Sequence, residues 1–156
     1  MQDLCSVGKR VPKLDAVDKA TGRAKYIQDL KVPGMLYGKI LYSKYAHARI
    51  VKIDTSKARA MPGVRAVITG DDVPEIKMGV YKDNRPLKKG NVRSYRDEVA
   101  AVAATTPEIA EEAIHLIEVT YEALPGVFDP EEAMKEDAPL VHEGHKTNVL
   151  RMPWKL

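Results

Sequence analysis

The stretch of residues 99–125 (VAAVAATTPEIAEEAIHLIEVTYEALP) constrains the fold more than any other part of the sequence, because its pattern changes twice. Residues 99–104 form an unbroken run of small apolar residues, which is typical of a strand covered on both faces. Over residues 109–117 the apolar residues recur at the helical period, and over residues 117–123 they alternate with polar residues. The sequence therefore predicts a strand, a helix and a second strand in direct succession.

The start of the predicted helix is marked by several residues. Thr105 and Thr106 are candidate N-caps, and Pro107 is tolerated in a first helical turn because its missing amide hydrogen would have no partner there. Glutamates follow in the first turns, where they interact favourably with the positive end of the helix dipole. These glutamates therefore have a structural explanation that needs no catalytic role.

The flanking residues predict further short elements. Strands are expected over residues 35–42, 50–54 and 64–69, and helical turns over residues 16–21 and after Ser56. A last short helix is expected to begin at Asp129, which is a suitable cap. Together they predict an α+β domain, in which a mixed sheet carries the central strand–helix–strand unit and short helices flank it.

The two ends of the chain show neither the helical period nor the alternation typical of a strand. Pro12 disfavours a helix near the N-terminus, so residues 1–14 are expected to form an arm. Residues 15–135 are expected to form the domain, and residues 136–156 an extended linker toward domains absent from the chain. The N-terminus has no apolar signal-peptide core and no run is long enough to span a membrane, so a cytoplasmic location and no membrane partner are expected.

The formal net charge is +3, but the charged residues are distributed unevenly along the chain. Residues 77–96 carry seven Lys/Arg and one Asp, whereas residues 97–143 carry thirteen Asp/Glu and one Lys. The stretch of residues 75–91 has no periodicity and exceeds the usual length of a connection, so it is functional, mobile or ordered by something outside the chain, and the last of these is favoured. A possible interface comprises six of the basic residues of the loop 77–96: Lys82, Arg85, Lys88, Lys89, Arg93 and Arg96.

No constellation in the sequence predicts catalysis, cofactor binding or a metal site. His142 and His145 are close, but they lie on a Gly-containing extended segment rather than on the helix that an H-E-x-x-H zinc motif requires. There is no G-x-S-x-G nucleophile motif and no glycine-rich phosphate loop. The single Cys5 cannot form an internal disulfide. The expected catalytic, cofactor-binding and metal residues in this chain are therefore none.

The order of several sequence blocks nevertheless resembles a known family. The blocks are VPKLDAVDKATGRAKY, PGMLYGKILYSKYAHARI, DTSKARAMPGVRAVITGDDVP, VAAVAA, IAEEAIHLIEVTYEALP, DPEEA and PLVHE. They are similar to the N-terminal α/β-hammerhead domain of the large, molybdopterin-binding subunit of molybdenum hydroxylases, which include xanthine dehydrogenases, aldehyde oxidases, carbon monoxide dehydrogenases and hydroxybenzoyl-CoA reductases. The resemblance covers about residues 7–148 and implies an α/β-hammerhead fold.

One short stretch departs from the family pattern. Where such proteins commonly read Tyr-Val-Gly-Glu-Pro, this chain has Ser94-Tyr95-Arg96-Asp97-Glu98. Arg96 and Glu98 thus replace a glycine and a proline. Because only glycine adopts every backbone conformation freely, Arg96 is expected to change any turn that depends on glycine.

The resemblance implies a structural and subunit-interaction domain of a molybdenum-dependent oxidoreductase, inactive by itself. In this family the main molybdopterin contacts and the catalytic glutamate belong to later domains. The parent complex would contain molybdopterin-molybdenum, iron-sulfur clusters and FAD, and the partners would be the remaining domains of the subunit and the iron-sulfur and FAD subunits. The substrate, the cofactor variant, the oligomeric state and whether the chain is excised or separately encoded stay open.

The alternative hypothesis is a free-standing nucleic-acid-binding module that uses the basic residues of the loop 77–96. Phosphate contacts by Lys77 and the six interface residues would make binding strongly dependent on salt. No recognisable RNA or DNA motif accompanies these residues, so the sequence favours the interaction domain.

Overall fold

The computed structural model describes residues 7–79 and 82–149, which divide into two units. In the first, residues 7–35, a short helix α1 (Ala16–Ala20) is capped by Thr21. Gly22 follows with a φ of 72°, which glycine readily adopts, and a 3-10 turn η1 (Ile27–Asp29) comes next. Every residue of this unit except Ala24 and Met35 is exposed, and Ile27 is 87% exposed. The first unit has no buried core of its own.

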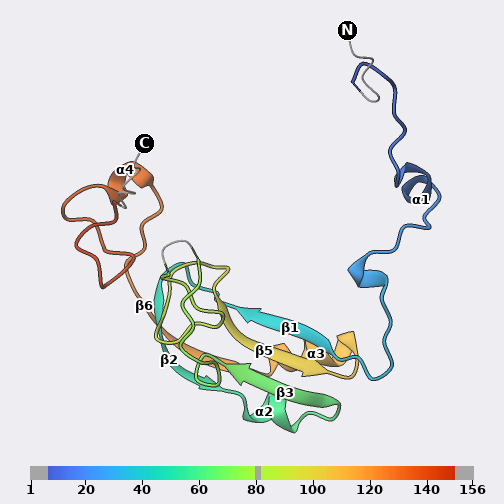
Figure 1. Ribbon diagram of the computed structural model, residues 1–156. Coiled ribbons are helices and arrows are strands. Elements are labelled where there is room, and N and C mark those ends of the chain that lie inside the picture. Colours follow the sequence, from blue (N-terminus) through green and yellow to red (C-terminus); the bar gives the residue numbers. More distant parts are fainter. Residues whose placement is uncertain (1–6, 80–81, 150–156) are drawn as a thin grey trace. The chain divides into compact units, whose positions relative to one another are not determined.

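The second unit, residues 36–149, contains two three-stranded sheets (Figure 1). In one, β5 (Glu98–Ala104) lies between β1 (Tyr37–Tyr42) and β3 (Val64–Thr69). In the other, β2 (Ala48–Asp54) lies between β4 (Asn91–Val92) and β6 (Glu118–Ala123). All four strand pairings are antiparallel.

The predicted α+β class and the strand–helix–strand succession are confirmed, but the single mixed sheet is not what forms. The two strands of that unit, β5 and β6, belong to different sheets. Since β1 and β3 occupy both edges of β5, no edge of β5 remains for β6, which pairs with β2 instead. The helix between β5 and β6 therefore connects the two sheets.

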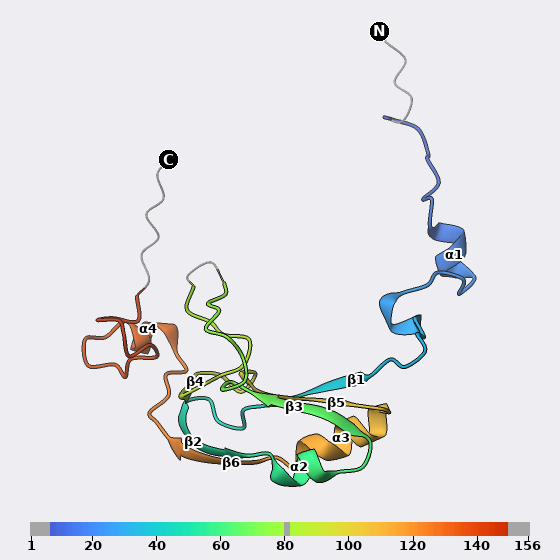
Figure 2. The ribbon, with the colours of Figure 1, turned by 60° about the horizontal axis from the view of Figure 1, so that its bottom comes forward.

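That helix, α3 (Pro107–His115), covers one face of the β1–β5–β3 sheet, and the short helix α2 (Ser56–Ala60) lies on the same side (Figure 2). The Thr106 hydroxyl caps α3 by accepting a hydrogen bond from the Ile109 amide at 3.3 Å. Small buried residues lie at the contact, among them Ala100 on the strand and Ala113 on the helix. They allow the helix and the sheet to approach closely.

No helix covers the opposite face of the same sheet in Figure 2. Ala101 is paired with Ile40 on one side and Ile68 on the other, which places all three side chains in one row across the sheet. Ile40 is 40% exposed and Ile68 is 41% exposed. We call this row the open sheet face.

After β6, a short helix α4 (Pro130–Ala133) is capped by Asp129, whose carboxylate accepts hydrogen bonds from two backbone amides. The described residues after α4 turn back toward it, while the expected division of the chain into arm, domain and linker stays a prediction. Asn148 holds this turn, because its amide group bonds to the backbone of Val141, Pro139 and Ala133. Residues 1–6 of the expected arm and 150–156 of the expected linker lie outside the described residues.

Candidate functional site

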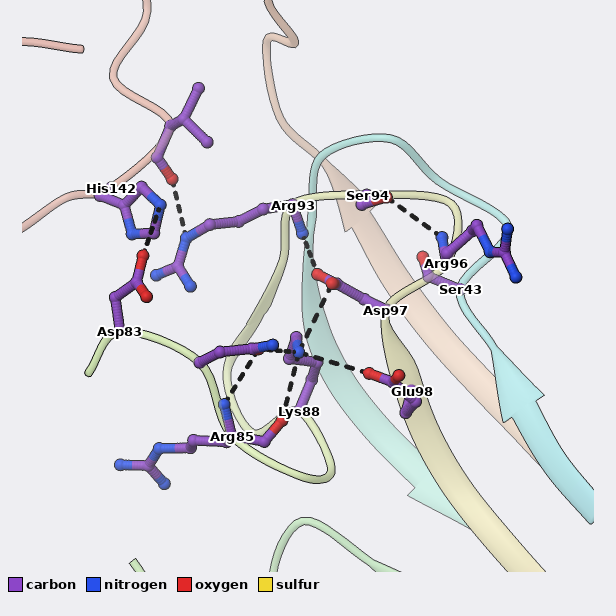
Figure 3. A network of polar contacts seen from close by, with 12 residues as sticks. Ser43, Asp83, Arg85, Lys88, Arg93, Ser94, Arg96, Asp97, Glu98 and His142 are labelled. Atoms are coloured by element: carbon purple, nitrogen blue, oxygen red, sulfur yellow. Dashed lines mark hydrogen bonds and ion pairs between the residues drawn. The ribbon is translucent and has the colours of Figure 1, made fainter. Parts of the chain in front are cut away.

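The loop before β5 is ordered by contacts within the chain, centred on Lys88 (Figure 3). The Lys88 side chain is buried, and its ammonium lies 3.5 Å from a carboxylate oxygen of Asp97 and 3.6 Å from one of Glu98. The ammonium also donates hydrogen bonds to the Asn84 side chain and the Arg85 carbonyl. The expectation that this stretch requires an outside surface for order is therefore not met around Lys88.

The same network fixes the entrance to β5. The Asp97 carboxylate accepts a hydrogen bond of 2.6 Å from the Arg93 amide, and the Asp97 carbonyl accepts one of 2.9 Å from the Ser43 amide. The Lys88 amide donates to the Glu98 carbonyl at 2.7 Å. Glu98, which replaces the family's usual proline, thus takes part in the ion pair with Lys88.

Arg96, which replaces the usual glycine, adopts a backbone conformation open to any residue. Among the described non-glycine residues, a positive φ occurs at Lys82, with φ 52°, and not at Arg96. The Arg96 side chain is exposed, and its guanidinium points away from Lys88 and Arg93 in Figure 3. The turn here does not depend on glycine, so the substitution introduces no backbone strain.

The six predicted interface residues do not form one surface. Lys88 is buried, and Arg96 points to the other side of the loop. Arg85 pairs with Glu75 at 2.8 Å, and Lys89 pairs with Asp71 at 2.7 Å. The interface function of the exposed members stays a prediction, as does the nucleic-acid alternative.

Five of these six residues, all except Arg96, instead line a cavity of about 460 Å³, which we call the basic cavity. Lys77, His142 and His145 also line it, and Asp83 contributes the one carboxylate among its described lining residues. The Arg93 guanidinium links the two walls, because its Nε donates to the Val141 carbonyl at 2.8 Å. The cavity therefore lies between the loop of residues 77–96, which we call the basic loop, and the turn that contains the two histidines.

These histidines lie on the linker expected over residues 136–156, and no pattern in the sequence connects them with the basic loop. Two contacts between residues far apart in the chain make the connection: Arg93 with Val141, and the Asn91 side chain with the Glu143 carboxylate at 2.6 Å. The one signal in the sequence is the His142-Glu143-Gly144-His145 pair itself, which lacks the features of a metal site. That this histidine pair lies close to several basic side chains becomes visible only in the folded structure.

Burial and the nearby Arg93 guanidinium lower the pKa of His142 below its ordinary value of 6.5. The unfolded chain should therefore bind more protons than the folded chain as the pH falls through this value. We expect the stabilising contribution of neutral His142 to the free energy of unfolding to be fully present above pH 6.5. It should be lost as the pH falls through the lower folded-state pKa. Urea denaturation at several pH values should show it, and His142→Gln should flatten the pH dependence. An unchanged slope in the variant would contradict the assignment.

The cysteine content of this chain does not fit one of the groups that the family resemblance implies, an iron-sulfur cluster. An iron-sulfur cluster needs several cysteine thiolates, and the sequence has one cysteine. No group of three His, Cys, Asp or Glu side chains suited to a metal ion occurs among the described residues.

In the same part of the chain, none of the helices has the length and apolar character needed to cross a membrane.

Comparison with known proteins finds consistent matches. Residues 21–125 match the family described as aldehyde oxidase and xanthine dehydrogenase, a/b hammerhead domain. The chain is 41% identical to the nicotinate dehydrogenase large molybdopterin subunit of Eubacterium barkeri, over 90% of this chain and 34% of that protein. It is 47% identical to a probable xanthine dehydrogenase subunit of Bacillus subtilis, over 83% of this chain and 18% of that protein.

The fold agrees with a solved relative as well. The crystal structure of quinoline 2-oxidoreductase from Pseudomonas putida 86 superposes with a TM-score of 0.76 and 40% identity, over 84% of this chain and 18% of that one. The chain thus spans about a third or less of the length of these relatives. The fold and the sequence agree that this chain belongs to the a/b hammerhead domain family of aldehyde oxidases and xanthine dehydrogenases.

Proposed function

We propose that the chain is a structural and subunit-interaction domain of a molybdenum hydroxylase-type oxidoreductase and has no catalytic group of its own. The observation that carries the proposal is the combination of family membership with apolar surfaces that remain exposed. The relatives are several times longer than this chain, so their additional domains are the natural partners.

The first exposed surface is the unit of residues 7–35. Leu14 is fully exposed, Val11 and Ile27 are largely exposed, and no residue of either helical turn is buried. An extended segment with apolar side chains and no core gains stability only when another surface covers it. We infer that this unit docks on the remaining domains of the subunit.

The second surface is the open sheet face. Its row of Ile40, Ala101 and Ile68 presents branched apolar side chains beside small ones, which suits close packing against another element. The parent complex would oxidise or reduce a heteroaromatic, aldehyde or acyl-CoA substrate at molybdenum. Iron-sulfur and FAD subunits would carry the electrons, and this domain would help to hold the assembly together.

Association can be tested with the Bacillus subtilis relative, produced without its own hammerhead domain. We expect the present chain to bind this truncated subunit in calorimetry, with that subunit's own hammerhead domain as the positive control. The double variants Leu14→Ser/Ile27→Ser and Ile40→Thr/Ile68→Thr should each weaken binding about tenfold or more, because buried apolar area is lost.

The control is Val51→Thr, an exposed apolar position on β2 outside both surfaces. It should leave binding unchanged, and binding of every variant is measured well below its urea midpoint, because Ile40 and Ile68 are only 40% and 41% exposed. If the relative's own domain binds and the present chain does not, the docking proposal is wrong. If neither double variant changes the affinity, the contact is made by other surfaces of the chain.

A further inference from the structure

We propose that the basic cavity binds a small phosphate-containing anion, with a diphosphate group as the preferred ligand. This inference is separate from docking, because it concerns a concave site inside the second unit and can be measured on the chain alone. The cavity volume of about 460 Å³ falls within the range of small-molecule sites, about 300–1,000 Å³. A compact anion fits such a cavity better than an extended acidic peptide does.

The charge of the lining favours an anion. Six Lys/Arg side chains and one carboxylate line the cavity among the described residues. Arg85, Lys89 and Lys88 are compensated by ion pairs with Glu75, Asp71, Asp97 and Glu98, so the remaining positive charge comes from Lys77, Lys82 and Arg93. Lys77 and Lys82 form no ion pair with any described residue. The cavity therefore retains uncompensated positive charge.

Arg93 is the best positioned donor. Its backbone amide is fixed by Asp97, and its Nε is fixed by the Val141 carbonyl, so the side chain is held at both ends. Its two terminal amino groups have no hydrogen-bond partner among the described residues, and Figure 3 shows the guanidinium directed toward Asp83 and His142. A pre-positioned guanidinium can bind a phosphate through two parallel hydrogen bonds.

The two histidines add donors that depend on protonation. Their ring centroids are 5.6 Å apart, and both rings line the cavity. Arg93 and His145 disfavour a charge on His142, whereas Asp83, at 3.5 Å, and Asp97 favour it. A bound anion adds a negative charge and should raise the pKa of His142. Protonated His142 would then also offset the negative charge of the Asp83 carboxylate, 3.5 Å away.

Calorimetry on the full 156-residue chain tests the proposal, with inorganic pyrophosphate, inorganic phosphate and a tetraglutamate peptide as separate ligands. At pH 6.5 we expect saturable pyrophosphate binding with a submillimolar Kd, weaker phosphate binding, and still weaker peptide binding. In buffers of different ionisation enthalpy, pyrophosphate binding should be accompanied by proton uptake. The ring signals of His142 and His145 should shift in NMR spectra.

Two variants separate specific recognition from general attraction. Arg93→Lys keeps the charge and loses the paired donors, so affinity should fall about tenfold. Lys77→Gln/Lys82→Gln should lower the affinity to a similar extent and reduce its salt dependence. The control Lys13→Gln/Lys25→Gln removes the same charge from the first unit and should have little effect.

Three results would overturn the proposal. The first is no saturable pyrophosphate binding at millimolar concentration. The second is tighter binding of the tetraglutamate peptide than of pyrophosphate, which would assign the cavity to an acidic protein partner. The third is equal loss of affinity in the control and the cavity variants, which would show attraction by net charge alone. None of these outcomes bears on docking through residues 7–35 or through the open sheet face, which uses other residues.

Discussion

Replacing Lys88 by methionine is expected to lower the free energy of unfolding by about 3 kcal/mol, near the lower end of the range for breaking a buried ion pair. The substitution keeps most of the side-chain volume but leaves two carboxylates without their cation. The side chains of Asp97 and Glu98 are only 15% and 35% exposed, so water replaces the ammonium incompletely. Urea denaturation of the full chain measures the effect.

The neighbouring residue provides a matched control. Lys89 pairs with Asp71 at a shorter distance, 2.7 Å, but both side chains are more than half exposed. Lys89→Met should therefore change stability by at most about 1 kcal/mol, as is usual for surface ion pairs. The triple variant Lys88→Met/Asp97→Asn/Glu98→Gln should recover much of the loss by removing the unpaired charges. Equal effects of Lys88→Met and Lys89→Met would contradict the assigned role of burial.

Gly70→Ala should lower the free energy of unfolding by about 2 kcal/mol, within the range for overpacking a tight interior contact. A Cβ atom at position 70 would lie 2.5 Å from the carbonyl oxygen of Lys88. That oxygen belongs to the backbone, so no side-chain rotation relieves the contact, and the basic loop must move away from β3. Hydrogen exchange should then show reduced protection of the Lys88 amide, which bonds to Glu98.

Gly38→Ala is the control for this substitution. Its Cβ would lie 3.9 Å from the nearest neighbouring atom, the Val102 carbonyl oxygen, which is an ordinary contact, and alanine is less costly than glycine in a strand. Stability should be unchanged or slightly higher. If Gly70→Ala behaves like Gly38→Ala, the close packing of the loop on β3 is not maintained in solution.

The elements that the sequence predicts well are those with a strong local pattern. The strand expected over residues 64–69 matches β3 at both ends, and Thr106 caps α3 as its residue type suggests. The strand expected from residue 50 begins two residues earlier, at Ala48, because pairing with Ala123 extends it. The partners of each strand are not contained in a local pattern, which is why two sheets form where one was expected.

The basic loop shows the same limit of local patterns more strongly. Its residues have no periodicity, and its order comes from contacts between Lys88 and the start of β5 and between Arg93 and Val141. Counting charges identifies the loop but cannot separate buried Lys88 from exposed Arg96. The basic cavity requires the approach of His142 and His145, which are distant in the sequence.

The order of strands in the two sheets has a consequence for synthesis of the chain on the ribosome. The central strand β5 is made after both of its neighbours, and β6, the long partner of β2, is made later still. Neither sheet can be completed until residues 98–104 and 118–123 have left the ribosomal tunnel. The apolar strands β1, β2 and β3 must therefore wait without their main partners, and this interval is when the nascent chain is most exposed to aggregation.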